Sequence, residues 1–207
     1  TIGFGSILFL MSLDMVFAQS LLFGDLSSYH GAAGVVGRGM VTFTAPIVAV
    51  MFPRLVKSFA TSEKSAALRM GMLATLGLCG IVVLLMATIP QVPIQIIYGP
   101  SFMDAAKLIP WFGLGMAPLC LANPLISQAL AIGDFRICRF ALISGGGYLL
   151  TLMLASEWIA ESAGLGGSFR ILWIMIAWNW FYLASVYWTL QHPIKRDSGK
   201  TFSSTDG

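Results

Sequence analysis

The sequence predicts an all-α membrane protein, and three observations support this fold class. Hydrophobic side chains make up 57% of the 207 residues and charged side chains only 10%, whereas about a quarter of the residues in soluble domains are charged. Six apolar stretches each reach the roughly 20 residues that a membrane-spanning helix needs. These stretches are continuous, unlike the alternating segments of about ten residues that are typical of transmembrane β-barrels.

The distribution of basic residues predicts the orientation of the chain in the membrane. The predicted spans cover residues 2–23, 31–53, 66–89, 104–133, 137–158 and 169–190, and a polar, serine-rich tail that we expect to be disordered covers residues 191–207. Nine of the twelve basic residues fall on one side of this topology. Basic residues are enriched in cytoplasmic loops. We therefore expect an integral protein of the plasma (inner) membrane, with both termini of this chain on the cytoplasmic side.

The first two spans contain the most informative pair of residues, Asp14 and Arg38. A charge in hydrocarbon costs about 2.5 to 3.5 kcal/mol on insertion scales, so such residues normally face protein, a partner charge or water. If residues 24–30 form a short loop, the two spans run antiparallel. At 1.5 Å per residue, the two charges then lie about 13 and 10 Å below the same membrane face. They lie at similar depths and could meet.

Prolines inside the second and fourth spans predict bends. Pro46 lies within the second span, and Pro110, Pro118 and Pro124 lie along the fourth, with Asn123 next to the last of them. Proline removes a backbone donor and clashes with the preceding turn. Broken helices in transporters line cavities and move. The alternative for the fourth span is a long tilted helix whose first turn is interfacial.

The other segments are interpreted mainly as packing and interface elements. The third span is uniformly apolar with three glycines, and the fifth contains a glycine run; small residues allow helices to approach closely in lipid. Residues 90–93 end the third span, and residues 94–99 follow at the outer interface. The four tryptophans of the sixth span are typical of packing and of interfacial belts.

Enzymatic chemistry is not expected. Ser144 precedes the glycine run, but a serine nucleophile needs a base within hydrogen-bond reach, and His30 and His192 lie at the edges of spans. The sequence has neither a phosphate-binding glycine loop followed by lysine nor a zinc motif. The three cysteines are interpreted as free, packed thiols. We therefore predict no catalytic residue, no metal, no cofactor and no nucleic-acid partner.

One segment resembles a known family. Residues 12–58 combine an apolar helix with an interior Asp14, a loop that ends in a tyrosine and small residues, the pair Gly37-Arg38 and an exit of sequence MFPR. This order is similar to the start of the carboxy-terminal lobe of the oligosaccharide flippases, the polysaccharide-biosynthesis branch of the MATE-like exporter superfamily. Residues 98–106 and the turn 130–136 are also similar to that family.

The resemblance implies a six-helix transmembrane lobe, which is half of a MATE-like two-lobe transporter. Such a transporter moves a lipid-linked oligosaccharide of the polyprenyl pyrophosphate type across the membrane for surface polysaccharide biosynthesis. It implies that Arg38 binds substrate, and that Asp14 either binds a coupling ion or forms a structural pair with Arg38. Asn123, beside the last proline of the fourth span, is our second candidate for substrate binding. The expected partners are membrane lipids, an N-terminal lobe that this chain lacks and polysaccharide-assembly proteins. The alternatives are a cation-coupled multidrug exporter lobe and a non-transporting truncated or assembly membrane protein.

Overall fold

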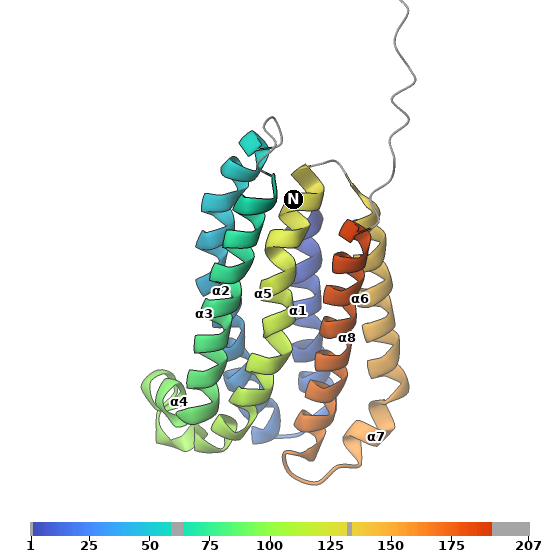
Figure 1. Cartoon of the computed structure of the whole chain (residues 1–207). Coiled ribbons are helices and arrows are strands. Elements are labelled where there is room, and N and C mark those ends of the chain that lie inside the picture. The colour runs from blue at the N-terminus through green and yellow to red at the C-terminus, as the bar shows by residue number, and fades with distance from the viewer. Residues whose placement is uncertain (1, 59–63, 132–133, 192–207) are drawn as a thin grey trace, which may run out of the picture.

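The chain forms a bundle of helices (Figure 1). The computed structural model describes the backbone of residues 2–58, 64–131 and 134–191, and the side chains of residues 12–44, 46, 69–130 and 134–191. All the regular elements within these ranges are helical. They are α1 (Ile2–Leu21), α2 (Asp25–Ser58), α3 (Lys64–Thr88), α4 (Gln91–Ile97), the 3-10 helix η1 (Pro100–Leu108), α5 (Ile109–Ala131), α6 (Arg136–Leu154), α7 (Ser156–Ala160) and α8 (Gly166–Gln191).

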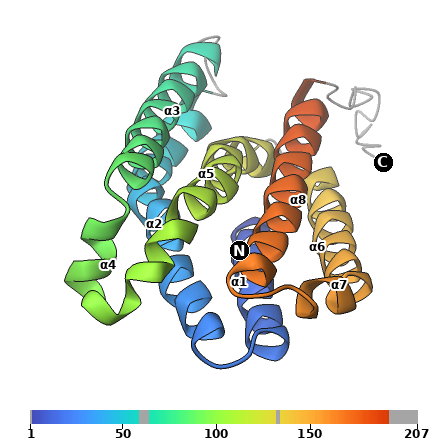
Figure 2. The same ribbon diagram turned by 90° about the horizontal axis from the view of Figure 1, so that it is seen from below.

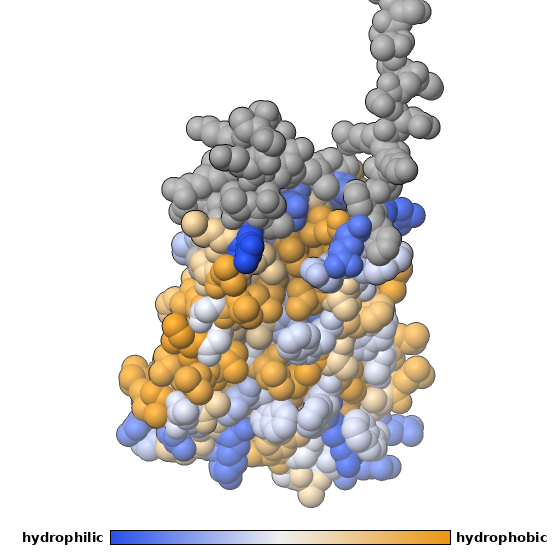
Figure 3. Space-filling model, in the orientation of Figure 1, coloured by the Kyte–Doolittle hydropathy of each residue, from blue (hydrophilic) through white to orange (hydrophobic). Residues whose placement is uncertain are grey.

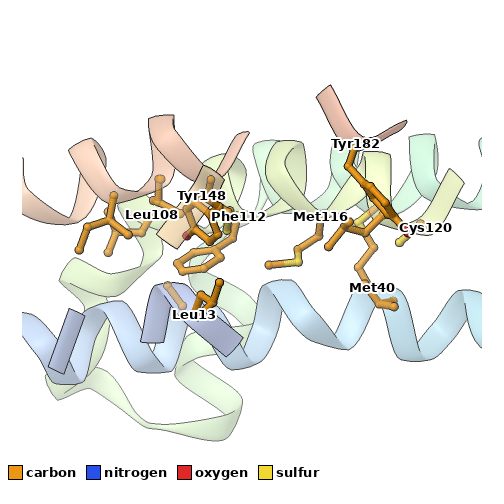
Figure 4. Packing of buried hydrophobic residues seen from close by; sticks show 14 of the residues in the cluster. Leu13, Met40, Leu108, Phe112, Met116, Cys120, Tyr148 and Tyr182 are labelled. Carbon is orange, nitrogen blue, oxygen red and sulfur yellow. The ribbon is translucent and has the colours of Figure 1, made fainter. Parts of the chain in front are cut away.

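Helix α5 is the centre of the bundle. It packs against α2 and α3 on one side and against α8 on the other, while α1 contacts both α2 and α6 (Figure 2). Phe112, Met116 and Cys120 recur every four residues along α5 and are fully buried, because this spacing places them on one face of a helix. Figure 4 shows these three residues in the core together with Met40 of α2 and Tyr182 of α8. The apolar core therefore runs along α5.

The described helices fit a membrane protein. Four segments are long and apolar enough to cross a membrane: Arg69–Thr88, Pro100–Leu130, Arg136–Leu154 and Gly166–Gln191. Figure 3 shows hydrophobic residues over much of the middle of one face, with hydrophilic residues gathered toward its ends. Many side chains of α1 and α2 lie outside the described residues. The count of six spans therefore stays a prediction, as does the orientation of the chain in the membrane.

The connection between α1 and α2 is shorter than predicted. Residues 24–30 were expected to form a loop, but α2 begins at Asp25 and only residues 22–24 connect the helices. Gly24 allows the tight turn because its φ is +62°, a value that glycine adopts without a Cβ penalty. Asp25 is acidic in the first turn of α2, where negative charge is favoured by the helix dipole. This prediction was wrong because polar residues at a helix start resemble those of a loop.

The predicted fourth span is two elements. Its first residues belong to η1, where Phe102 has non-helical dihedrals, and α5 begins only at Ile109. Pro110 is therefore in the first turn of α5, where a missing N–H leaves no helical bond unmade, and it marks a helix start rather than a bend. Pro118 and Pro124 lie inside α5. Pro46 lies inside α2, which is helical on both sides of it.

Two arginines connect the ends of α8 to neighbouring segments through hydrogen bonds. Arg136 donates to the carbonyl of Thr189 at 3.1 Å and pairs with Asp134 at 2.7 Å. The hydrogen bond from Arg136 holds the pKa of Asp134 below its ordinary value. At the opposite end of α8, Arg170 lies 4.3 Å from the ring centroid of Trp158 and donates to the Trp158 carbonyl. The predicted tail beyond Gln191 lies outside the described residues.

Helices α6 and α8 meet through small and polar residues. Gly147 leaves the space in which the Trp178 ring packs, since an added Cβ there would overlap the indole. The indole N–H of Trp178 donates to the Thr151 hydroxyl at 3.1 Å, and Ser144 donates to the Trp178 carbonyl at 3.3 Å. Gly147 is therefore the close-contact position of the glycine run.

We expect Gly147→Ala to lower the free energy of unfolding by about 1 to 3 kcal/mol, because the new methyl group would displace a packed ring. Gly146→Ala is the matched control, since nothing lies within 4 Å of a Cβ at that neighbouring position. Unfolding by SDS in mixed micelles measures both variants. Equal stability of Gly147→Ala and Gly146→Ala would contradict the packing described for α6 and α8.

Candidate functional site

Asp14 of α1 and Arg38 of α2 form a buried ion pair. One guanidinium nitrogen, Nη2 of Arg38, donates to both carboxylate oxygens of Asp14 at 3.0 and 2.9 Å. Nη1 donates to the Met15 sulfur at 3.3 Å. The Asp14 side chain has no solvent exposure, and the Arg38 side chain keeps 18% of its own. Asp14 and Arg38 therefore meet, although the loop over residues 24–30 on which the depth comparison was based is part of α2.

Two glycines of α2 make room at the ion pair, one for the arginine and one for α5. A Cβ at Gly34 would lie 3.2 Å from Nη1 of Arg38 and 3.3 Å from the Phe112 ring. A Cβ at Gly37 would lie 2.6 Å from Cβ of Phe112. The absent side chain at Gly34 therefore leaves space for the guanidinium, and the one at Gly37 lets α5 approach α2. The Gly37-Arg38 motif thus has a steric reason that involves α5.

His30 is a member of the site that the sequence analysis missed. Its imidazole is fully buried, with Nε2 at 3.5 Å from Oδ2 of Asp14 and the ring 5.0 Å from that of Phe112 in an edge-to-face arrangement. Neither ring nitrogen has a hydrogen-bond partner among the described residues. From the sequence, His30 is expected at the edge of a span. Its spacing of eight residues from Arg38 was an available signal, because residues four apart share one helix face.

Tyr148 of α6 adds a second unsatisfied polar group. Its side chain is fully buried, and its hydroxyl has no hydrogen-bond partner among the described residues. Helix α6, which carries Tyr148, packs against α1, which carries Asp14. Figure 4 shows Tyr148 and Phe112 at the same level of the core. We call Asp14, His30, Arg38 and Tyr148 the buried polar cluster.

The buried polar cluster can perform two kinds of chemistry. Arg38 is always charged and presents a fork of donors that suits phosphate oxygens; it is also the only one of the four residues with an exposed fraction above zero. The His30 imidazole and the Asp14 carboxylate lie side by side in the interior, with Nε2 3.5 Å from Oδ2. The arrangement is therefore suited to binding an anion at its open edge, and it holds two groups that can carry a proton in its interior.

Asn123 lies elsewhere on α5. It is buried, and its backbone carbonyl accepts a hydrogen bond from Ser127 at 3.0 Å. Eleven residues separate it from Phe112, the α5 residue that packs on His30, which corresponds to about 16 Å along a helix. The structure thus does not bring Asn123 into the buried polar cluster. The expectation that it binds substrate together with Arg38 has no support from this geometry.

Other predicted site types can be placed as well. Within the described ranges, no three His, Cys, Asp or Glu side chains are grouped as a metal site would require. Ser144 donates to a backbone carbonyl of α8. Cys79 and Cys120 are buried free thiols, and Cys138 is a partly buried one. His192 lies outside the described residues.

The ion pair predicts an asymmetric response to substitution. Arg38→Met leaves the Asp14 carboxylate buried without its cation, and we expect the free energy of unfolding to fall by about 3 to 5 kcal/mol. The double variant Asp14→Leu with Arg38→Met removes both charges and should recover most of this loss. Unfolding by SDS in mixed micelles measures both. A double variant no more stable than Arg38→Met would show that the buried charge is not the cause.

No protein family model, curated protein or solved structure matches this chain. The geometry of the buried polar cluster and the surface around it are therefore the basis for a functional proposal.

Proposed function

We propose that this chain is the C-terminal lobe of a MATE-like transporter that flips a lipid-linked oligosaccharide across the plasma membrane. Arg38 is proposed to bind the pyrophosphate, and both termini of this chain are placed on the cytoplasmic side. One observation carries the proposal: within the buried polar cluster, Arg38 alone reaches the surface. Arg38 lies inside a predicted membrane span, where a charge is costly unless it faces protein, a partner charge or water.

The exposed side of α1 is more polar than those of α3 and α6. Between residues 12 and 21, its exposed residues are Ser12, Val16, Gln19 and Ser20, three of which are polar. By contrast, the exposed residues of α3 between 70 and 87 and of α6 between 142 and 154 are all apolar. Polar side chains within a membrane normally face protein or water rather than lipid. The α1 side is therefore the best candidate for the surface that faces a substrate cavity.

The ion pair provides a way to coordinate substrate and proton. In this structure, Arg38 directs its Nη2 donors to Asp14, so a phosphate must compete with the carboxylate for them. A proton taken up by Asp14, or shared with His30, would weaken the electrostatic attraction between the Asp14 carboxylate and the Arg38 guanidinium. Release of Arg38 toward the surface would then accompany proton uptake, and rocking of the two lobes would follow in an alternating-access cycle.

A cation-coupled multidrug exporter lobe is the second candidate. The 3.5 Å approach of His30 to Asp14 favours it, because a buried proton site does not require an anionic substrate. A cationic drug would need an uncompensated carboxylate, however, and Asp14 is already paired with Arg38. The flippase proposal therefore accounts for more of the geometry.

The test is Arg38→Ala in a full transporter that contains this sequence. We expect loss of surface polysaccharide in this variant and also in the double variant Asp14→Leu with Arg38→Met, which leaves no uncompensated carboxylate. Glycan immunoblotting of whole cells measures export, and the transporter content of membranes measures insertion. Arg139→Ala is the control, because Arg139 is exposed on α6 and lies outside the cluster. Full export by the Arg38→Ala variant would refute the phosphate role. Recovery of export by the charge swap Asp14→Arg with Arg38→Asp would assign the pair a structural role only.

A further inference from the structure

Two free cysteines face each other where α3 packs against α5. Cys79 of α3 and Cys120 of α5 are both buried free thiols, and a side-chain hydrogen bond joins them. The two helices run antiparallel, because the chain reverses its direction through α4 and η1 (Figure 1). Figure 4 shows Cys120 in the core of the bundle beyond Met116. The interface between α3 and α5 therefore holds a pair of neighbouring thiols.

The separation of the two helix backbones suits a disulfide. A Cβ built at Gly113 of α5 lies 3.7 Å from the Cβ of Met86 of α3, and a disulfide needs about 3.5 to 4.5 Å between Cβ atoms. Cys79 lies seven residues before Met86, and Cys120 lies seven residues after Gly113. Seven residues are close to two helical turns, so this step returns to the same contact line of both helices. The thiol pair therefore lies on the line along which α3 and α5 approach closely.

The surroundings of the pair select the class of oxidant that can reach it. Cys79 lies near the middle of the apolar segment Arg69–Thr88, about 15 Å along the helix from Arg69. Charged oxidants are excluded from such a place by the cost of leaving water, whereas an uncharged organic hydroperoxide dissolves in hydrocarbon. Thiols react as thiolates, and here the neighbouring thiol is a hydrogen-bond donor to the thiolate that forms.

We propose that Cys79 and Cys120 are a redox-active pair, which an apolar hydroperoxide converts into a disulfide between α3 and α5. One thiol first takes an oxygen atom from the hydroperoxide, which leaves a sulfenic acid and an alcohol. The second thiol then attacks the sulfenic sulfur. An S–S bond forms, the S–O bond breaks, and the hydroxyl group leaves as water with the proton of the second thiol. The two electrons that the thiols lose reduce the O–O bond.

The disulfide would restrict the helix at the centre of the bundle. Helix α5 packs against α2, α3 and α8, so a covalent bond from α3 to α5 connects two of its neighbours through it. Pro118 and Pro124 lie on either side of Cys120 inside α5, and each proline removes one helical hydrogen bond. The bridge would therefore hold α5 at the part of the helix where bending costs least. Oxidation of the membrane is then converted into a loss of helix movement.

Peptide mass spectrometry of the chain in nanodiscs tests the proposal. The Cys138→Ser variant has Cys79 and Cys120 as its only thiols, and the unsubstituted chain is treated in parallel. After treatment with cumene hydroperoxide, the remaining thiols are alkylated with N-ethylmaleimide. We expect a disulfide-linked pair of peptides that contain Cys79 and Cys120, loss of alkylation at both and recovery of both by dithiothreitol. Hydrogen peroxide, the water-soluble probe, should form this disulfide more slowly at the same concentration.

Single-cysteine chains provide the matched controls. The variant that keeps only Cys79 or only Cys120 should stop at the sulfenic acid, which dimedone traps. The variant that keeps only Cys138, a partly buried thiol on α6, reports that the hydroperoxide has reached the protein. Absence of the Cys79–Cys120 disulfide where Cys138 is oxidised would overturn the proposal, as would disulfides formed only between two chains. A faster reaction with hydrogen peroxide than with cumene hydroperoxide would overturn the assignment of the oxidant.

Discussion

The ion pair between Asp14 and Arg38 is the constraint on which this part of the bundle depends. Two opposite charges attract strongly at low dielectric, but removing them from water is costly, so the pair persists only with good geometry around it. The structure supplies that geometry through contacts from three helices. Gly34 leaves room for the guanidinium, and Gly37 lets Phe112 of α5 pack against α2. The positions of α1, α2 and α5 are thereby fixed relative to one another.

Helix α2 separates two chemically distinct surfaces. On one side, Arg38 reaches the Asp14 carboxylate, and the buried His30 lies beside it. On the other side, Val35, Gly39 and Phe43 line an apolar groove. Because α5 packs against α2 as well as α3 and α8, α2 connects the ion pair to the centre of the bundle.

The sequence predicts the helical class, because hydrophobic runs depend only on local chain geometry. It indicates that Asp14 and Arg38 could meet, but the depths calculated for them assumed a loop over residues 24–30 that belongs to α2. It does not predict the position of His30, since a polar first turn of a helix and a loop have similar compositions. Tyr148 could not be assigned either, because its place near the ion pair depends on how α6 packs against α1. The 3-10 segment before α5 was missed for a related reason: an apolar run does not distinguish one long helix from two shorter elements.

The central claim is that Arg38 exchanges the Asp14 carboxylate for a lipid phosphate, and solid-state NMR distances test it directly. Samples of the chain in lipid bilayers would carry ¹⁵N-arginine and ¹³C-aspartate, with Arg38→Lys used to assign the Arg38 signal. We expect dipolar coupling between the Arg38 guanidinium and Asp14 Cγ without ligand. Added polyprenyl pyrophosphate should weaken that coupling and introduce one between the guanidinium and ³¹P. An unchanged coupling to Asp14, with none to ³¹P at saturating lipid, would contradict the account.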